Sequence, residues 1–141
     1  MELPILYSFR RCPYAMRARM SIIRTNFKVD HREVILRDKP QHMMEISPKG
    51  TVPVLQLLDS TVIEESLEIM KYVLSWNLTY DERKWIERND GEFKFHLDRY
   101  KYPNRYNDVD HLEHRFEASK YINELNIKIL EGNLSDAIFP F

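Results

Sequence analysis

The chain has one cysteine, Cys12, and the residues around it could make its thiol reactive. Pro13 fits the first position of a helix, which makes Cys12 the expected N-cap residue. The N–H groups of a first helical turn have no partner inside the helix, and we expect them to point at the Cys12 sulfur. The positive helix end, with Arg10 and Arg11 beside it, would favour the thiolate, the nucleophilic form.

The same cysteine also fits a purely structural role. Free cysteines are among the most buried residue types and pack as small apolar side chains. Position in the sequence alone therefore leaves two interpretations of Cys12, a reactive thiol and a buried core residue. A single cysteine forms no internal disulfide, which is typical of a reducing compartment, and dithiol chemistry would need a thiol from another molecule.

Two further segments carry residues that could bind a ligand. Pro53 precedes the apolar run 54–58, as it would at a tight turn with a cis peptide bond or at an ordinary trans start of a strand. Glu65 and Ser66 open a predicted helix, where a hydroxyl and N–H groups suit a carboxylate and a glutamate suits an ammonium group. Taken by itself, Ser66 also fits a simple helix N-cap.

The elements that must position these residues alternate between strand and helix. Short apolar runs predict four strands, at 5–9, 31–36, 54–58 and 61–63, the last two forming a hairpin. Helical spacing predicts three helices, at 13–25, at 41–46 and from 66 onward. The order over residues 1–76 is therefore β-α-β-α-β-β-α.

The sequence changes character after residue 76. Residues 77–80 form a natural boundary, and beyond them only helical patterns follow. Thr79 and Glu82 have the spacing of a capping box at the first of these helices. Its predicted buried face consists of Trp85, Asn89, Phe93, Leu97 and Tyr100. A second helix, ending near Gly132, is predicted to bury Leu112, Phe116, Ile122, Leu125 and Ile129.

The order of the motifs resembles a known family. The sequence carries Cys12-Pro-Tyr-Ala, Lys39-Pro40, Val52-Pro53 and Glu65-Ser66, in this order. This order resembles that of the motifs in the thioredoxin-like N-terminal domain of cytosolic glutathione transferases. The first motif is most similar to the cysteine-type omega class and its bacterial relatives. The resemblance implies an α/β thioredoxin-like glutathione-binding domain at 1–76, a linker at 77–80 and an incomplete all-α glutathione-transferase-type C-terminal domain at 81–141.

The resemblance also implies a role for each motif residue. Cys12 would be the catalytic thiol that forms a mixed disulfide with glutathione, and Lys39 would reach the glycyl carboxylate. Val52, beside a cis proline, would pair its backbone with the cysteinyl part, while Glu65 and Ser66 would hold the γ-glutamyl ammonium and carboxylate. The implied glutathione-binding residues are Phe9, Tyr14, Lys39, Val52, Pro53, Glu65 and Ser66.

Ala15 stands where a dithiol glutaredoxin-like protein would carry its resolving cysteine. The expected mechanism is therefore monothiol, with Cys12 accepting glutathione from a glutathionylated substrate, or reducing a dehydroascorbate-like acceptor, and a second glutathione releasing it as oxidised glutathione. Two alternatives stay open. One is conventional conjugation, with Tyr7 or Ser8 as the activating hydroxyl; the other is a non-catalytic binding or regulatory protein on the same scaffold, like the stringent-starvation-type factors.

Charge and hydropathy exclude other classes of function. Lysine and arginine number 21 against 22 acidic residues, a net charge of −1, so no nucleic-acid partner is expected. The basic and aromatic segment 99–105 is assigned to a helix end and its loop. Because the longest apolar runs are far shorter than a membrane span, we expect no membrane partner and a cytoplasmic location.

Two histidines near the C-terminal half have metal-like spacing. His111 and His114, with Asp108 and Asp110 close by, could lie together on a helix. We interpret them as a solvated helix face and expect no metal, since no further Cys or His completes the pattern. The expected partners are glutathione and a small or protein thiol or disulfide acceptor, and the resemblance implies a homodimer.

Overall fold

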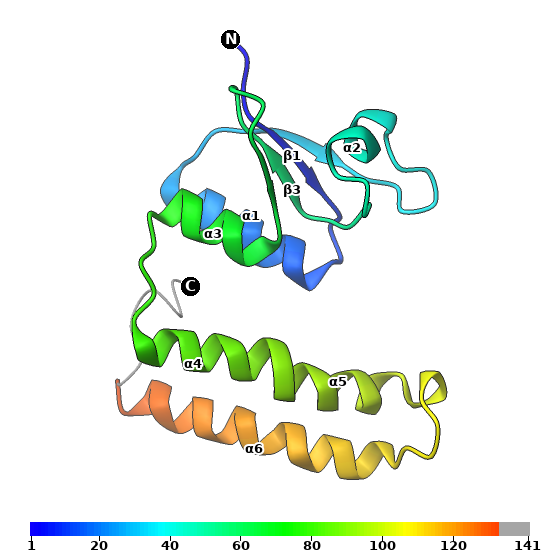
Figure 1. Cartoon of the computed structure of the whole chain (residues 1–141). Helices are drawn as coiled ribbons and strands as arrows, with labels where there is room; N and C mark the ends of the chain where they lie inside the picture. Colours follow the sequence, from blue (N-terminus) through cyan, green and yellow to red (C-terminus); the bar gives the residue numbers. More distant parts are fainter. Residues whose placement is uncertain (133–141) are drawn as a thin grey trace. The chain divides into compact units, whose positions relative to one another are not determined.

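Two units make up residues 1–132, the part of the chain that the computed structural model describes; the first covers residues 1–77 and the second begins at residue 78. The first unit has the predicted order β-α-β-α-β-β-α (Figure 1). Its elements are β1 (Ile5–Ser8), α1 (Pro13–Thr25), β2 (Asp30–Glu33), α2 (Gln41–Ile46), β3 (Val54–Gln56), β4 (Val62–Glu64) and α3 (Ser66–Leu74).

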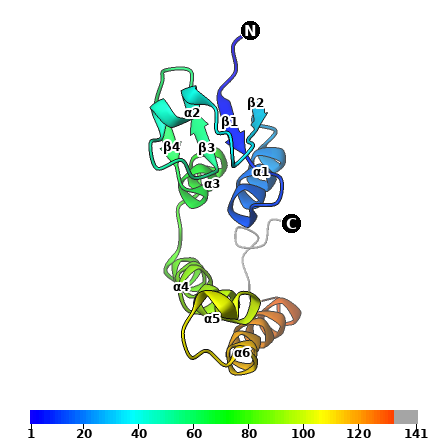
Figure 2. The ribbon, with the colours of Figure 1, turned by 90° about the vertical axis from the view of Figure 1, so that its right-hand side faces the viewer.

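The four strands form one mixed sheet in the order β2-β1-β3-β4 (Figure 2). β1 is parallel to β2 and antiparallel to β3, which is in turn antiparallel to β4. Because successive side chains of a strand point to opposite faces, the sheet separates two apolar clusters. Leu6 and Leu55 pack with residues of α1 and α3, whereas Tyr7 and Val54 pack with Met43 of α2.

The second strand differs from the predicted one. The apolar run 34–36 was expected to form its end, but β2 consists of Asp30–Glu33, and all four of its side chains are exposed. β2 is an edge strand, where polar side chains are favoured because they discourage pairing with another chain. Val34 is buried just beyond the strand, whereas Ile35 and Leu36 are exposed beside an isolated bridge between Ile35 and Asp38.

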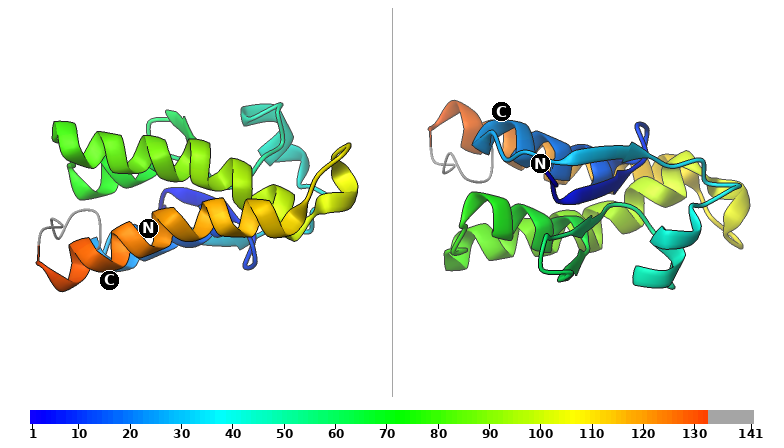
Figure 3. Two further views of the ribbon diagram at one scale, coloured as in Figure 1. Left: turned by 90° about the horizontal axis from the view of Figure 1, so that it is seen from below. Right: turned by 90° about the horizontal axis from the view of Figure 1, so that it is seen from above.

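The described part of the second unit is entirely helical. It contains α4 (Tyr80–Arg88), a π-helical turn η1 (Asn89–Phe93), α5 (Lys94–Lys101), a 3-10 turn η2 (Pro103–Arg105) and α6 (His111–Leu130). α5 and α6 lie side by side (Figure 3). The predicted capping box is confirmed, because Thr79 Oγ1 accepts from the Glu82 N–H at 3.2 Å while Glu82 Oε2 accepts from the Thr79 N–H at 2.8 Å. Within residues 1–132, no helix has the length and apolar character needed to cross a membrane.

The predicted buried face of α6 is wrong in most of its members. The buried residues of this helix are Ala118 and Tyr121, and the Tyr121 ring stacks on Phe93 with 4.8 Å between ring centroids. α6 carries apolar residues around much of its circumference, so spacing alone did not identify the face that packs. Leu112, Phe116, Ile122 and Ile129 are exposed, and Leu125 is half-buried.

The face predicted for the preceding helix is confirmed in four of its five members. Trp85, Asn89, Phe93 and Leu97 are half-buried, whereas Tyr100 is exposed. The π-helical turn at Asn89–Phe93 places more residues in one turn than an α-helix does, which shifts the phase of the residues that follow. The packed face therefore runs through residues spaced four apart, from Trp85 to Leu97, and of the predicted residues Tyr100 falls outside it.

The central strand β3 supplies a test of the core. Leu55 is fully buried between β1 and β4, so we predict that Leu55→Ala lowers the free energy of unfolding by about 3 kcal/mol, measured by urea denaturation. The matched control is Leu58→Ala, because Leu58 is 64% exposed and its truncation should change stability by less than about 0.5 kcal/mol. Equal losses in the two variants would contradict this description of the core.

Candidate functional site

The predicted site residues lie at the edge of the sheet that the ends of β1 and β4 and the start of β3 form, and not along the edge strand β2. β1 and β3 are antiparallel, with Tyr7 opposite Val54, and β3 and β4 are antiparallel, with Val54 opposite Glu64. The loop after β1, the loop before β3 and the start of α3 after β4 therefore lie at the same end. These three segments carry Cys12, Val52, Pro53, Glu65 and Ser66.

Cys12 is the N-cap residue of α1, as predicted. Its backbone is extended (φ −78°, ψ 119°), Pro13 is the first helical residue, and the Cys12 carbonyl accepts the first α1 hydrogen bond from the Met16 N–H at 2.9 Å. The Cys12 side chain is half-buried. This exposure excludes the fully buried core cysteine that the sequence left open.

The contacts of the sulfur differ from the expected ones. The N–H groups of the first α1 turn give the Cys12 side chain no hydrogen bond. Instead, the thiol lies 3.8 Å from the Val52 carbonyl oxygen, a distance at which an S–H group donates weakly. The side chain reaches Val52 because the strand pairing brings these two loops together. The peptide bond that follows, Val52-Pro53, is cis, as the resemblance implied, and Pro53 is buried.

Glu65 and Ser66 begin α3, but the N-cap residue is Glu65 and not Ser66. Glu65 is the N-cap, with φ +64° and ψ 128°, and Ser66 is the first helical residue. A positive φ at a glutamate is strained, and such strain tends to cluster at functional sites. The Glu65 side chain is exposed, whereas Ser66 is 3% exposed and its Oγ accepts a hydrogen bond from Arg17 Nε at 2.8 Å.

Lys49 supplies a cation at the start of α3, in the corner that Glu64, Glu65 and Ser66 form. Its ammonium group forms an ion pair with Glu65 and lies 3.8 Å from Glu64 Oε2. The hydrogen bond to Glu65, and then the attraction of the two carboxylates, raise the pKa of Lys49 above the ordinary lysine value. The Glu65 carboxylate therefore already binds an ammonium group.

The other predicted residues lie near this edge with more limited contacts. Lys39 is half-buried, and its Nζ lies so close to Gly50 that a Cβ there would be 3.3 Å away. Gly50 has φ +64°, which favours glycine independently of that contact. Phe9 and Tyr14 are half-buried; the Phe9 carbonyl accepts from the Cys12 N–H at 3.0 Å, and the Tyr14 ring faces the Arg17 guanidinium.

Sequence reasoning missed three basic residues that hold this edge together. Arg17 bonds Ser66, Lys49 pairs with Glu65, and Arg19 bonds the loop between β1 and α1. A signal existed for two of them. Arg17 and Arg19 lie in the first turns of a helix that begins at a candidate nucleophile, where cationic side chains need anionic or carbonyl partners.

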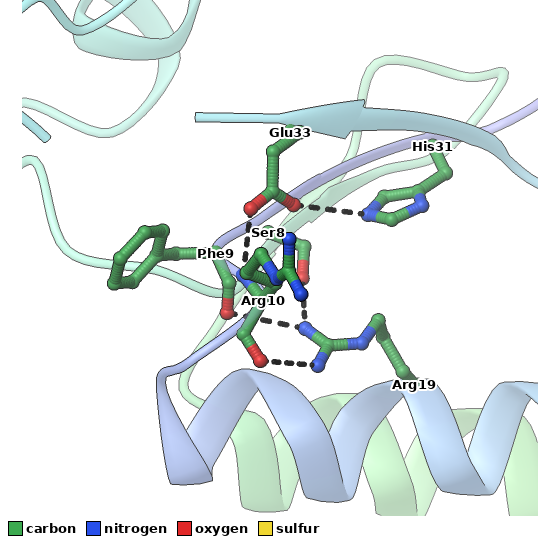
Figure 4. Close-up of polar contacts among 6 residues, drawn as sticks. All are labelled: Ser8, Phe9, Arg10, Arg19, His31 and Glu33. Atoms are coloured by element: carbon green, nitrogen blue, oxygen red, sulfur yellow. Dashed lines mark hydrogen bonds and ion pairs between the residues drawn. The ribbon is translucent and has the colours of Figure 1, made fainter. Parts of the chain in front are cut away.

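The loop that carries Cys12 is held from two sides (Figure 4). Arg19 donates to Ser8 Oγ at 2.6 Å, to the Phe9 carbonyl at 3.2 Å and to the Arg10 carbonyl at 2.9 Å. Glu33, at the end of β2, accepts from the Arg10 N–H at 2.8 Å. Residues 8–10 thus have side-chain partners from both α1 and the edge strand.

The two alternative hydroxyls are not available to a ligand in this structure. Tyr7 and Ser8 are 1% and 0% exposed. The Tyr7 hydroxyl shares a 2.6 Å hydrogen bond with His42 Nδ1 and accepts one from Arg32, while Ser8 Oγ accepts from Arg19. Both hydroxyls therefore form hydrogen bonds within the protein.

Two other places with site-like features lie apart from this edge. His114, considered above for metal spacing, has its Nδ1 2.7 Å from Nδ1 of His96 on α5. In residues 1–132, no three or more His, Cys, Asp or Glu side chains are grouped to hold a metal ion. A cavity of about 730 Å³ is lined by residues including Ile5, Arg32 and Gln56, but by none of the predicted site residues.

The N-terminal half of the chain is similar to known proteins. Residues 6–77, about half of the chain, match the family model described as glutathione S-transferase, N-terminal domain. A probable glutathione transferase of Aplysia californica is 39% identical over 64 residues, which cover 45% of this chain and 68% of that protein. Glutathione S-transferase omega-1 of Rattus norvegicus is 32% identical over 79 residues, which cover 56% of this chain and 32% of that protein.

The fold is also found among solved structures. A glutathione transferase Omega 3C from Trametes versicolor superposes with a TM-score of 0.74 at 22% identity. The match covers 91% of this chain and 59% of the Trametes chain. The chain thus spans about a third of the rat protein and just over half of the fungal one.

The Lys49–Glu65 pair gives a pH-dependent test of this corner. We predict that Glu65→Gln lowers the raised pKa of Lys49 toward the ordinary lysine value, measured by NMR titration of the lysine side chain. Because the folded pKa is the raised one, the contribution of the pair to stability is present at neutral pH and disappears as the pH rises through the Lys49 pKa. Glu68→Gln is the control, since Glu68 pairs with Lys71 and should leave Lys49 unchanged.

Proposed function

The chain belongs to the glutathione S-transferase family through its N-terminal domain, and from this membership we propose that it is a glutathione-dependent thiol transferase with Cys12 as the catalytic thiol. One observation carries the proposal above the others. Cys12 is a half-exposed helix N-cap whose sulfur lies beside the Val52 carbonyl, on the loop that leads to the cis proline. A half-exposed thiol in this place can reach a disulfide, and thiol–disulfide exchange proceeds by attack of the sulfur on that disulfide.

The contacts around Cys12 suit the parts of glutathione. The Val52 backbone precedes a strand and is free of the sheet ladder, so it suits the peptide-like middle of the tripeptide. Glu65 suits the γ-glutamyl ammonium, because its exposed carboxylate already holds the Lys49 ammonium. The Ser66 hydroxyl suits the γ-glutamyl carboxylate, and Lys39 suits the glycyl carboxylate.

In the proposed cycle, the Cys12 thiolate attacks the glutathionyl sulfur of a glutathionylated thiol, R–S–S–G. The bond between Cys12 and that sulfur forms as the original S–S bond breaks, and the leaving thiolate R–S⁻ takes a proton from water. A glutathione thiolate then attacks the glutathionyl sulfur of the mixed disulfide, which yields oxidised glutathione and returns the Cys12 thiolate. Ala15 offers no second thiol for an internal disulfide.

This reaction is favoured over conventional conjugation because the two candidate hydroxyls, those of Tyr7 and Ser8, are buried. Conjugation needs a hydroxyl that stabilises the thiolate of glutathione, and Tyr7 and Ser8 are buried and hydrogen-bonded within the protein. Cys12 is the group at this edge that reaches the surface at the head of α1. A thiol in that place forms a disulfide with glutathione more readily than it activates the glutathione thiol.

The first test concerns the thiol itself. We predict that incubation with oxidised glutathione adds one glutathionyl group to the protein in an intact-mass measurement, and that a reducing agent removes it. Cys12→Ser, which keeps a polar side chain of similar size at the N-cap, should show no adduct and should lose thiol-transferase activity by at least about 100-fold. An unmodified wild-type protein, or a Cys12→Ser variant with full activity, would falsify the proposal.

The second test concerns recognition of the γ-glutamyl carboxylate. The Arg17 Nε donates to Ser66 Oγ, so the hydroxyl hydrogen of Ser66 is left to donate to a ligand. We predict that Arg17→Met raises KM for glutathionylated substrates about 5-fold, because an oriented hydrogen bond to a charged group is lost. The same variant should leave KM unchanged for a mixed disulfide of cysteinylglycine, which lacks the γ-glutamyl group; equal losses on both substrates would count against this assignment.

A further inference from the structure

The turn that presents Cys12 is short and depends on side chains from outside it. The Cys12 N–H donates to the Phe9 carbonyl at 3.0 Å, which closes a four-residue turn between β1 and α1. This one bond does not provide partners for the N–H and carbonyl groups of Arg10 in the middle of the turn. The position of Cys12 therefore depends on the groups that satisfy the rest of the turn.

Arg19 satisfies three successive residues of this segment. One terminal nitrogen donates to Ser8 Oγ and to the Phe9 carbonyl, and the other donates to the Arg10 carbonyl (Figure 4). A guanidinium presents its donors in a rigid planar fork, whereas a lysine ammonium is a single point of charge. Arg19 lies on α1 itself, so the fork ties the turn to the helix whose N-terminus Cys12 caps.

Glu33 holds the turn from the opposite direction. Its Oε1 accepts from the Arg10 N–H at 2.8 Å, and its Oε2 lies 3.7 Å from His31 Nε2. The next residue, Val34, donates its N–H to the Ser8 carbonyl at 2.8 Å, so the segment directly after β2 supports the end of β1 as well. The turn is thus held between α1 and the edge strand.

Burial indicates which of these contacts matters most. Ser8 is fully buried, and its Oγ accepts a hydrogen bond from the Arg19 guanidinium. Removing Arg19 would leave this oxygen and the Arg10 carbonyl without that donor, and a buried acceptor without a partner destabilises the conformation that buries it. The turn would then relax toward conformations in which these oxygens reach water.

We propose that Arg19 is a positioning residue that keeps Cys12 at the helix N-terminus, acting through the geometry of its fork and not through its charge. The proposal deepens, and rests on, the assignment of Cys12 as the catalytic thiol. The three hydrogen bonds of Arg19 go to oxygens of Ser8, Phe9 and Arg10, and none of them goes to the sulfur.

The test compares two substitutions at Arg19 by the rate at which iodoacetamide alkylates Cys12. Arg19→Lys keeps the positive charge and loses the fork, whereas Arg19→Met loses both. Both variants should be alkylated at neutral pH at a rate about 10-fold different from that of the wild type, because a loosened turn no longer holds the half-buried thiol beside the Val52 carbonyl. The proposal would be overturned if the Arg19→Lys variant were alkylated within twofold of the wild-type rate while the Arg19→Met rate changed. That result would assign the effect to the charge of Arg19.

Controls separate a local effect from unfolding. Arg24→Lys makes the same substitution at an exposed position in the last turn of the same helix and should react at the wild-type rate. Ser8→Ala is the second variant, since it keeps Arg19 and removes only its buried acceptor. Its effect should be smaller, about 3-fold, and should not add to that of Arg19→Lys, because contacts in one network are not independent. Additive effects would overturn the proposal.

A kinetic readout distinguishes positioning from binding. If thiol-transferase turnover is present, Arg19→Lys should lower kcat and leave KM for glutathionylated substrates unchanged, since Arg19 contacts none of the residues assigned to the γ-glutamyl and glycyl groups. A raised KM with an unchanged kcat would contradict positioning. Alkylation needs no glutathione, so the absence of any glutathione adduct would reject the proposed function while the alkylation rates still decide the role of Arg19.

Discussion

The antiparallel pairing of β1 with β3 is the constraint on which the rest of the structure depends. It places the end of one strand beside the start of the other, with Tyr7 opposite Val54. Residues 40 positions apart, Cys12 and Val52, therefore meet at one edge of the sheet. The further pairing of Val54 with Glu64 brings the start of α3 to the same edge. A one-residue slip in either pairing would exchange the faces of the strand and move the attached loop.

Basic side chains then join the loops that the sheet brings together. Arg17 and Arg19 are two residues apart on α1, and they reach different partners because a helix turns by about 200° between such positions. Arg17 bonds Ser66 on α3, and Arg19 bonds the turn before Cys12. One helix thus supports both the proposed binding corner and the turn that carries the thiol. Lys49 adds a third cation, from the loop before β3, to the same corner.

Local patterns in the sequence predicted the features that depend on neighbouring residues. Pro13 after Cys12 correctly indicated the helix start, because a proline lacks the N–H that the first turn leaves unpaired. Thr79 and Glu82 correctly indicated a capping box, because both of its hydrogen bonds join residues three positions apart. The order of strands and helices over residues 1–76 was predicted for the same reason, since apolar period and turn residues are local properties.

What the sequence by itself determined was the list of elements, the place of the thiol at a helix start and the motifs that resemble a glutathione site. Only the tertiary structure decided what each side chain contacts. The Cys12 sulfur faces Val52 and not the first-turn N–H groups, and α6 buries Ala118 and Tyr121 and not the residues that its spacing predicted. These outcomes depend on groups far away along the chain, and a pattern of spacing carries no information about which distant surface a side chain will meet.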